Sequence, residues 1–347
     1  MDASVVIVNY QGRGTLTRCL DAVALQHGVE LETIVIDNAS PDGSADEADG
    51  RAGVSVVRNR ENVGFGRACN QGAELASGRV LLFLNFDSRP EPGWAAALVA
   101  CLADHPHAGA AQGVVLREPS GDVNTAGNRV HYLGFGWAPQ GGPPPPVASQ
   151  PYEVFCASGA ALAIPRALFL EIGGFWEAMF LYQEDADLSW RVHLSGRRVL
   201  CCPAARSHHD YEFSRNRAKY FHLERNRLLM VAANYERGSL IRLAPALLAT
   251  EAAMVAVAAR GGFLSYKLRA TASAVRALPV IRAQRRRVRA LRRASDREIG
   301  PLLETRLGDE FGAGIARASA PLLRGYLDLV APAWRRRSAA GPVSGDA

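Results

Sequence analysis

Residues 80–87 read VLLFLNFD. An unbroken apolar run at 80–84 is followed directly by Asn85-Phe86-Asp87. A continuous apolar run of this length is typical of a strand that is buried on both faces, as in a parallel sheet. Similar runs rich in β-branched residues occupy residues 4–8, 32–36 and 54–57. The sequence therefore predicts four central strands before residue 88.

The stretches that lie between or after these runs show the apolar spacing of amphipathic helices. Helices are predicted at residues 15–26, 65–76 and 94–103. The alternation predicts an α/β protein with a doubly wound, mostly parallel sheet flanked by helices. In open sheets of this kind ligands bind beyond the carboxyl ends of the strands, so the residues that follow each apolar run are the candidate site.

Asp37 follows the second apolar run and begins the polar turn Asn38-Ala39-Ser40-Pro41-Asp42-Gly43-Ser44. An Asp at the end of a strand is suited to hydrogen bonding with a ribose or a nucleobase. Asn9 and Tyr10 follow the first run and belong to the same edge. The alternative is that Asp37 only forms an Asx turn that caps the next helix.

Asn85 and Asp87 are one residue apart, so on an extended chain their side chains point the same way. A carboxylate and an amide oxygen suit Mg²⁺ or Mn²⁺ bound to a diphosphate, because phosphate oxygens and water fill the other positions. The alternative is a turn that merely ends the strand. His208, after a last predicted strand at 198–202, could complete the metal shell or steady a phosphate, whereas a structural histidine is the other interpretation.

Three carboxylates, Glu184, Asp185 and Asp187, lie just ahead of a predicted helical stretch at 189–194. Neighbouring carboxylates repel each other and resist burial, so folding alone gives little reason to place them beside aromatic residues. An acid–base site needs such a pair, in which one carboxylate stays ionised and its neighbour tunes it. The alternative is an acidic helix N-terminus stabilised by the helix dipole.

The segment Gly64-Phe65-Gly66-Arg67-Ala68-Cys69 does not indicate a dinucleotide cofactor. Cys69 stands where the third glycine of that fingerprint belongs, and the segment does not follow the first strand. Asn62-Val63-Gly64 instead predicts a turn into a helix whose N-terminal amides face a nucleotide.

Residues 118–150 are rich in Gly, Pro and Asn, with four prolines at 143–146. This composition predicts a long surface loop, which is either a mobile binding loop or a spacer.

Downstream of about Tyr220 the pattern is helical throughout. Residues 240–264 are apolar but interrupted by charges and Pro245, and the longest uncharged stretch among them falls short of the ~20 residues that a spanning helix needs. Arginines crowd residues 267–293, beside this apolar stretch, which predicts a surface that lies on an anionic membrane leaflet. A solvated face packed on the rest of the protein and a spanning helix are the alternatives. Aromatic residues are scarce there, which argues against nucleic-acid binding.

The chain has 347 residues and a net charge of +6, with many acidic residues in its N-terminal half and mostly arginine after residue 260. Its six cysteines lack metal-type spacing, and Cys201-Cys202 are adjacent, which favours a reducing cytoplasm. The opening MDASVVIVNY has no basic region, so no signal peptide is expected.

Six motifs together resemble those of family-2 glycosyltransferases and stand in the same order. They are Val8-Asn9-Tyr10, Asp37-Asn38-Ala39-Ser40-Pro41-Asp42-Gly43-Ser44, Asn62-Val63-Gly64-Phe65-Gly66, Leu84-Asn85-Phe86-Asp87, Gly173-Gly174-Phe175 and Glu184-Asp185-Ala186-Asp187-Leu188-Ser189-Trp190-Arg191. The resemblance is greatest to the non-processive, rhamnosyltransferase-like branch with a GT-A fold, and it covers residues 3–235. No Gln-x-x-Arg-Trp signature of processive synthases is present.

The resemblance implies an inverting transferase that uses a nucleotide-diphosphate sugar. Asp185 matches the family's catalytic base, and Glu184 and Asp187 would orient the base, the metal or the acceptor. Asp87 and His208 would hold Mg²⁺ or Mn²⁺. The donor nucleotide would be bound by Asn9, Tyr10, Asp37, Asn38, Asn62, Gly64 and Asn85.

The chain departs from the family's pattern in two places. Phe86 and Ser88 replace the Pro and aliphatic residue common around the metal motif, which leaves the ligands intact. Trp176 stands where an Asp often follows Gly-Gly-Phe, which bears on the acceptor pocket.

The expected organisation is a GT-A catalytic domain at 1–235, with a flexible acceptor-side loop at 118–150. A helical, basic, membrane-associating region at 236–337 and a disordered tail at 338–347 follow. We expect a cytoplasmic enzyme on the inner face of the cell membrane, with dTDP-rhamnose as first donor and UDP-sugars next. The acceptor would be a glycan or a polyprenyl-linked molecule in cell-surface polysaccharide synthesis.

Two other functions compete with this interpretation. One is a catalytically silent membrane scaffold that only binds a nucleotide, against which intact Asp87 and Asp185 argue. The other is a sugar-nucleotide pyrophosphorylase, which needs a Gly-rich, basic phosphate loop after the first strand. Gln11-Gly12-Arg13-Gly14 is too short and has one basic residue.

Overall fold

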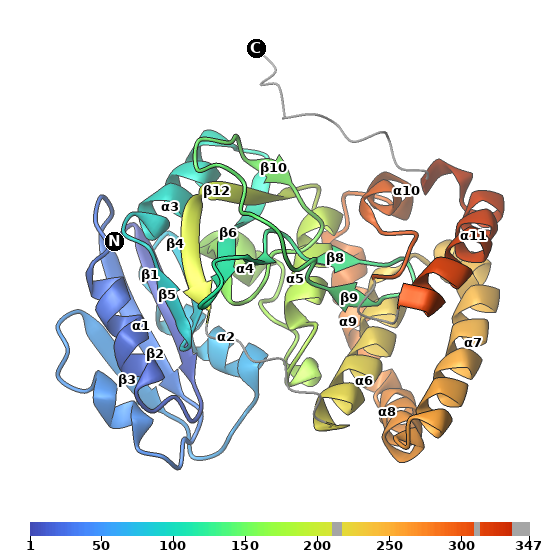
Figure 1. Cartoon of the computed structure of the whole chain (residues 1–347), viewed down its shortest axis with the longest axis horizontal. Helices are drawn as coiled ribbons and strands as arrows, with labels where there is room; N and C mark the ends of the chain where they lie inside the picture. The colour runs from blue at the N-terminus through green and yellow to red at the C-terminus, as the bar shows by residue number, and fades with distance from the viewer. Residues whose placement is uncertain (210–216, 309–312, 335–347) are drawn as a thin grey trace.

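The computed structural model describes residues 1–209, 217–308 and 313–334, so the tail expected at 338–347 lies outside the described residues (Figure 1). The strands are β1 (Ala3–Asn9), β2 (Leu31–Asp37), β3 (Val54–Arg58), β4 (Val80–Asn85), β5 (Ser88–Pro90), β6 (Ala108–Arg117), β7 (Val123–Thr125), β8 (Arg129–Val130), β9 (Gly136–Trp137), β10 (Tyr152–Glu153), β11 (Ala161–Pro165) and β12 (Arg198–His209). The α-helices are α1 (Thr15–Ala24), α2 (Phe65–Leu75), α3 (Trp94–Asp104), α4 (Arg166–Glu171), α5 (Glu184–Leu194), α6 (Arg217–Asn234), α7 (Arg237–Arg260), α8 (Leu264–Arg276), α9 (Leu278–Leu291), α10 (Asp296–Ile299) and α11 (Ala313–Val330).

Within residues 1–209 a ten-stranded sheet runs in the order β10-β12-β6-β11-β4-β1-β2-β3, with β5 paired to β12 and β7 to β6. β3, β2, β1 and β4 pair in parallel, and so do β6 and β12. β11 is antiparallel to both β4 and β6 and joins the two parallel groups. The predicted mostly parallel sheet flanked by helices is confirmed.

The alternation of side chains along β1 builds a core on each face of the sheet. Val5 and Ile7 pack in the cluster that contains the buried residues of α1 and α3. Val6 and Val8 pack in a second cluster, with buried residues of α2, α4 and α5. Every residue of β1 is buried, which explains its unbroken apolar pattern in the sequence.

The register of the parallel strands sets the polar edge of the sheet. Asn9, the last residue of β1, pairs with Asp37, the last residue of β2. On the other side of β1, Val8 pairs with Asn85 at the end of β4. The three carboxyl ends therefore lie next to one another.

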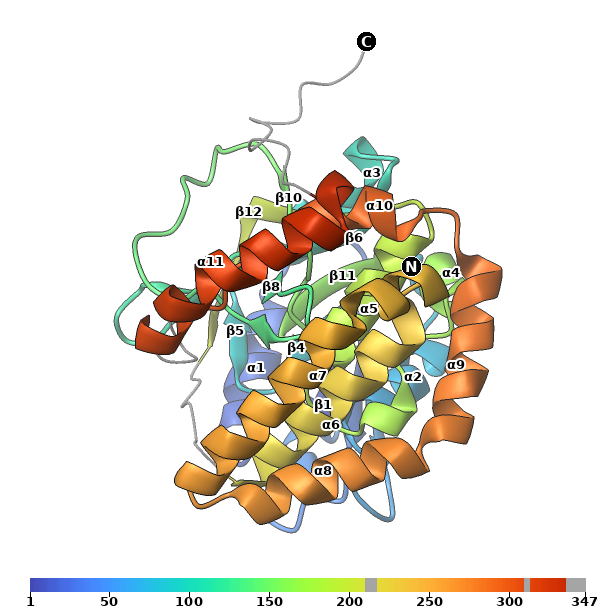
Figure 2. The same ribbon diagram turned by 90° about the vertical axis from the view of Figure 1, so that its right-hand side faces the viewer.

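The C-terminal helices share a hydrophobic core with the α/β part. One cluster joins buried Trp190 of α5 and Met230 of α6 to Ile281 of α9 and Trp334 near the end of the described chain. Figure 2 shows α7 on the outer side of this core, with α11 above it, α8 running below it and α6 behind it.

The structure differs from the predicted surface loop at 118–150 in its middle. Tyr132, Leu133 and Phe135 are buried in the core shared with the C-terminal helices, and β8 pairs with β9 around them. Glycine and proline on either side hide this short apolar run in the sequence.

Two element boundaries also differ from the prediction. The α5 helix begins at Glu184, so the carboxylates lie inside its first turn rather than ahead of it. β12 continues from Arg198 to His209 and carries both histidines as strand residues. The additional strand β6 went unpredicted because its small residues, Ala-Gly-Ala-Ala, give little hydrophobic signal.

Among the described residues, α7 is the one helix that is long and apolar enough to cross a membrane by length and composition, and 6% of its most apolar window is buried. Arg242, Glu251 and Arg260 interrupt residues 240–264, so no uncharged stretch there reaches ~20 residues, and α7 meets the criterion by its overall length and composition.

Candidate active site

A buried hydrogen-bond network joins the ends of β1 and β2. The Asn9 side-chain amide donates to Asp37 Oδ1 at 2.8 Å, to Ser44 Oγ at 2.8 Å and to Ser40 Oγ at 3.1 Å. The backbone amide of Ser40 donates to Asp37 Oδ2 at 3.2 Å. Gly12 packs directly against this network. A Cβ at this position would come within 2.3 Å of Asn9 Oδ1, so the close approach requires glycine. Asn9 and Asp37 are buried, so they set the shape of the edge, while Tyr10 is exposed.

A second network runs from Asn38 to the start of α2. The Asn38 side-chain amide donates to Asn62 Oδ1 at 3.0 Å and to the carbonyl of Gly64 at 3.3 Å. Asn62 Oδ1 in turn accepts from the Gly64 amide at 2.9 Å. Gly64 has φ +87°, and a Cβ there would come within 2.5 Å of the Phe180 carbonyl, so the turn tolerates no side chain. Five of the seven residues predicted to bind the donor nucleotide thus lie in two adjoining networks, namely Asn9, Asp37, Asn38, Asn62 and Gly64.

Asp87 faces a histidine, but the histidine is His209. Asp87 lies in the turn between β4 and β5, and its Oδ1 is 2.9 Å from His209 Nε2. β5 pairs with the end of β12, with Ser88 opposite His209, and this pairing brings the two side chains together. The alternate-residue argument for Asn85 and Asp87 does not hold, because the chain turns after Asn85.

The prediction of His208 at this point is corrected. Neighbouring residues on a strand point to opposite faces, and β12 is extended through both histidines. His208 Nε2 lies 2.9 Å from Glu91 Oε1, and its Nδ1 lies 3.6 Å from Glu118 Oε1.

Asp87 and His209 fit a divalent cation that a substrate helps to hold. In the chain as described, no group of three or more His, Cys, Asp or Glu residues forms a closed metal site. Mg²⁺ in phosphate-transfer sites keeps several waters and takes only one or two protein carboxylates with substrate phosphates. A carboxylate oxygen and an imidazole nitrogen that meet at the edge of the sheet match that limited donor set.

Glu184 and Asp185 lie side by side in the first turn of α5 but in different surroundings. Glu184 is buried, and its Oε2 makes no hydrogen bond within the described residues. Burial, and then the charge of Asp185, raise the pKa of Glu184 to about 8. Asp185 is half-buried, and burial raises its pKa as well, against hydrogen bonds from the amides of Gly159 and Ala186 that lower it.

Asp187 is a structural carboxylate rather than a reacting one. It is fully buried; Arg191 Nε donates to its Oδ2 at 2.9 Å, and Arg191 Nη2 forms an ion pair with the same oxygen at 2.7 Å. Asn234, at the end of α6, donates to Oδ1 at 2.8 Å. Oδ2 is therefore bound within α5 and Oδ1 joins α5 to α6, which argues against the predicted place of Asp187 in the catalytic group.

A short segment before β11 connects the carboxylates to the metal motif. The Gly159 amide donates to Asp185 Oδ2 at 3.2 Å, and the Ala160 carbonyl accepts from the Asn85 amide at 3.2 Å. The Ser158 amide donates to buried Gln112 Oε1 at 2.7 Å and so fixes the segment to β6. Asp185 is thereby linked to the end of β4 through the two consecutive residues Gly159 and Ala160.

Strained backbone precedes α5. Phe180, Tyr182 and Gln183 have φ of +64°, +70° and +66°, a region that costs non-glycine residues about 1–3 kcal/mol each. The Asn226 side-chain amide on α6 lies 2.8–2.9 Å from the carbonyls of Met179, Leu181 and Tyr182. These contacts hold the segment in place.

Sequence patterns did not indicate four of the residues that shape this site, which are His209, Gly159, Gln112 and Asn226. His209 had a signal, because it adjoins His208 at the end of the last predicted strand. The other three act through contacts across 26 to 47 residues of chain, which no local pattern reveals.

The model of the family described as glycosyl transferase family 2 matches residues 4–173. An N-acetylglucosaminyl-diphospho-decaprenol L-rhamnosyltransferase of Mycobacterium tuberculosis is 30% identical over 249 residues, which cover 63% of this chain and 79% of the relative.

Two solved structures show the same fold at low sequence identity. GalNAc-T7 with UDP, GalNAc and Mn²⁺ matches with a TM-score of 0.57 and 21% identity, over 68% of this chain and 48% of the other. S. aureus TarS 1–349 in complex with UDP-GlcNAc matches with a TM-score of 0.53 and 18% identity, over 94% and 89% of the two chains.

Proposed function

The chain belongs to glycosyltransferase family 2, with a GT-A fold and a nucleotide-sugar donor, and from this premise we propose that it is an inverting, metal-dependent rhamnosyltransferase. The observation that carries the proposal is the placing of Asp185 beside the carboxyl end of β4, through Gly159 and Ala160. A base at that point stands next to the edge where the donor's diphosphate would lie.

Asp185 is the proposed catalytic base. The acceptor hydroxyl gives its proton to this carboxylate while its oxygen forms a bond to the anomeric carbon. The bond from that carbon to the diphosphate oxygen breaks, and its electron pair leaves with the nucleoside diphosphate. Because attack comes from the face opposite the leaving group, the anomeric configuration inverts. Glu184, with its raised pKa, keeps its proton at neutral pH and leaves a single charge on the pair.

Asp87 and His209 are the proposed protein ligands of Mg²⁺ or Mn²⁺. When bound, the cation offsets the negative charge of the departing diphosphate. The donor nucleotide is assigned to the two edge networks, with exposed Tyr10 and Asn62 as the contacting side chains and Asn9, Asp37, Asn38, Gly64 and Asn85 shaping the edge.

The relative in M. tuberculosis supports the choice of sugar and acceptor. It is named as an L-rhamnosyltransferase that acts on N-acetylglucosaminyl-diphospho-decaprenol. We therefore assign dTDP-rhamnose as donor, with UDP-sugars as the next choice, and a polyprenyl-linked glycan in cell-surface polysaccharide synthesis as acceptor. Such an acceptor places the enzyme in the cytoplasm, on the inner face of the membrane.

The proposal predicts rhamnose transfer that depends on Asp185. Purified protein with Mn²⁺, dTDP-rhamnose and a short-chain prenyl-diphospho-N-acetylglucosamine should give a disaccharide product by mass spectrometry, with inverted anomeric configuration by NMR. Asp185→Asn should lower turnover by about 10²–10⁴-fold, since the base is removed. Calorimetry should find dTDP binding unchanged in this variant.

Two outcomes would contradict the proposal. Wild-type turnover in Asp185→Asn would show that another group is the base. Nucleotide binding without consumption of any donor would instead favour the silent membrane scaffold.

A further inference from the structure

The exposed side of α7 carries an apolar stripe from Ile241 to Ala259. At spacings of three and four residues it presents Ile241, Pro245, Leu248, Ala252, Val255 and Ala259, all exposed. This spacing places them in one stripe on a helix. A helix on the surface of a soluble protein shows the opposite pattern, with its polar side outward.

The charged side chain in the middle of α7 points inward instead. Glu251 pairs with Arg227 of α6 and with Lys267 of α8, whose Nζ lies 2.6 Å from Glu251 Oε2. Lys267 also pairs with Glu224 at 2.6 Å, and Lys267 and Arg227 are fully buried. This buried cluster attaches α7 to the rest of the protein through its polar side.

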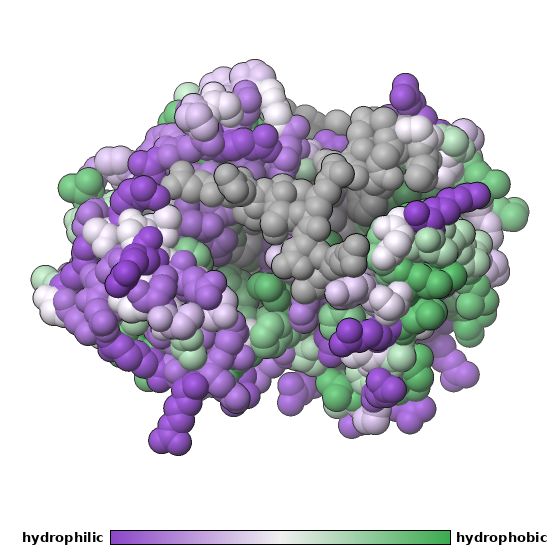
Figure 3. Space-filling model, turned by 60° about the horizontal axis from the view of Figure 1, so that its bottom comes forward, coloured by the Kyte–Doolittle hydropathy of each residue, from purple (hydrophilic) through white to green (hydrophobic). Residues whose placement is uncertain are grey.

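A second helix extends the apolar stripe. α11 contacts α7, and the Tyr326 hydroxyl donates to the Arg242 carbonyl at 2.6 Å. Leu322 and Leu329, seven residues apart on α11, are 75% and 80% exposed, and Leu248 on α7 is 70% exposed. We name this surface the α7–α11 face and define it by Ile241, Leu248, Val255, Leu322 and Leu329. Figure 3 shows hydrophobic surface gathered over the side formed by the C-terminal helices, whereas the α/β side is mainly hydrophilic.

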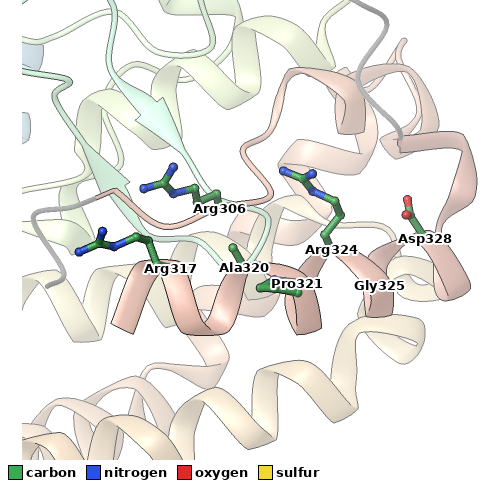
Figure 4. A pocket seen from close by; sticks show the side chains of 7 residues that line it. All are labelled: Arg306, Arg317, Ala320, Pro321, Arg324, Gly325 and Asp328. Atoms are coloured by element: carbon green, nitrogen blue, oxygen red, sulfur yellow. The ribbon is translucent and has the colours of Figure 1, made fainter. Parts of the chain in front are cut away.

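Arginines border the α7–α11 face. Arg242 and Arg260 are exposed near the two ends of α7. Along α11, a pocket of about 560 Å³ is lined by Arg306, Arg317 and Arg324, together with Asp328 (Figure 4). Residues 236–337 contain 20 basic and 8 acidic residues, a net charge of +12, whereas residues 1–235 contain 20 basic and 25 acidic residues, a net charge of −5.

We propose that the α7–α11 face is the surface by which the protein docks on a bilayer that contains anionic phospholipids. The exposed leucines and valines enter the boundary between headgroups and acyl chains, and the bordering arginines pair with lipid phosphates. A second copy of the chain fits this face less well, since a two-fold contact places the same patch, arginines included, against itself. A spanning α7 is also disfavoured, because it would have to leave Arg227 and Lys267 behind.

This inference deepens the proposed function, because a polyprenyl-linked acceptor would be held at the surface on which the enzyme lies. Lipid binding itself needs neither donor nor acceptor. It can therefore fail or succeed independently of rhamnose transfer.

Vesicle co-sedimentation of the full chain, without nucleotide, tests the proposal. The probes are vesicles of phosphatidylcholine alone and of phosphatidylcholine mixed with phosphatidylglycerol. Wild type should sediment with the mixed vesicles and much less with phosphatidylcholine, and added salt should weaken binding. The double variant Leu322→Ser/Leu329→Ser, and separately Leu248→Ser, should weaken binding by about tenfold or more per leucine.

Leu25→Ser is the matched control, because Leu25 is 66% exposed and lies at the end of α1, away from the face. It should bind as wild type does. Equal vesicle binding by the face variants and this control would overturn the proposal, and so would absence of binding by wild type. Analytical ultracentrifugation gives the remaining outcome: a dimer that dissociates only in the face variants would show that a second copy covers the face.

Discussion

Glu184 and Asp185 are neighbours in sequence, yet their different burial gives the two carboxyl groups different tendencies to ionise. Glu184 is buried with one carboxylate oxygen unpaired, and its pKa rises to about 8. Asp185 is half-buried and accepts two backbone hydrogen bonds, which favour its ionised form. Of the pair, Asp185 is therefore the carboxylate that ionises first and can take a proton from an acceptor.

The raised pKa of Glu184 predicts a pH-dependent cost to folding. The ordinary pKa of this group is 4.5 and its folded value is about 8. Between these values the unfolded chain binds fewer protons than the folded one, so the free energy of unfolding falls as pH rises. Glu184→Gln, which mimics the protonated acid, should melt near wild type at about pH 5 and on the order of 2–5 °C above it at about pH 8.

Thermal melts across this pH range, followed by circular dichroism, measure the effect. Glu74→Gln, at an exposed glutamate of α2, should keep the pH profile of wild type. If the Glu184→Gln and wild-type curves run parallel from pH 5 to pH 8, the folded pKa of Glu184 is not raised.

The sequence indicates which carboxylates form the site, but not what each one does. Asp185 stands out by its motif and neighbours. In the sequence Asp187 is indistinguishable from a reacting carboxylate. The structure shows that Asn234, 47 residues further along the chain, donates a hydrogen bond to it. His208 and His209 are equivalent in sequence, and only the pairing of β5 with β12 decides which one meets Asp87.

Among the helices, α6 positions the catalytic helix without contributing a reacting group. Its Asn226 contacts three carbonyls of the strained segment before α5, and its Asn234 binds Asp187 inside α5. Stacking of His222 on the Phe180 ring adds a third contact between the two elements. Because α6 holds the first turn of α5 through these contacts, we expect substitutions in α6 to move that turn.

Asn226→Ala should lower kcat with little change in nucleotide binding. Removing the amide leaves three carbonyls without their donor and frees Phe180, Tyr182 and Gln183 to leave the left-handed region, which shifts Asp185. We expect kcat to fall by about 10–100-fold and the free energy of unfolding by about 1–3 kcal/mol.

Steady-state kinetics and calorimetry with dTDP separate these effects. Thr250→Ala, which removes a hydrogen bond from one side chain to a carbonyl within α7, is the control and should keep kcat. A loss confined to stability, with kcat intact, would show that α6 supports the fold but does not place the base.

The sequence predicts strands well where their apolar runs are long, as in β1, β2 and β4. It fails where tertiary contacts supply the burial. β6 is made of small residues and is recognisable only by its place between β11 and β12. The segment around Tyr132 resembles a loop because the core that buries it comes from α6, α9 and the segment around Trp334.

Over the whole molecule, residues 236–334 are built into the catalytic part rather than appended to it. Trp190 of α5 and Tyr235 pack edge to face with ring centroids 4.8 Å apart, and Tyr235 stacks on Trp334 at 5.6 Å. The Tyr235 hydroxyl donates to the Tyr132 carbonyl at 2.7 Å. The sequence-based division near residue 235 therefore falls inside one packed region of side chains.

The buried cluster of Glu224, Arg227, Glu251 and Lys267 makes this coupling measurable. Lys267→Ala leaves two carboxylates with a single guanidinium, and breaking such a buried pair costs about 3–5 kcal/mol. Because the helices share a core with α5, the loss should lower one cooperative transition of the whole chain. Thermal unfolding followed by circular dichroism and by release of bound dTDP should then coincide, both at lower temperature than in wild type. Arg269→Ala, at an exposed neighbour, should leave both unchanged, whereas two separate transitions in Lys267→Ala would establish an independent C-terminal domain.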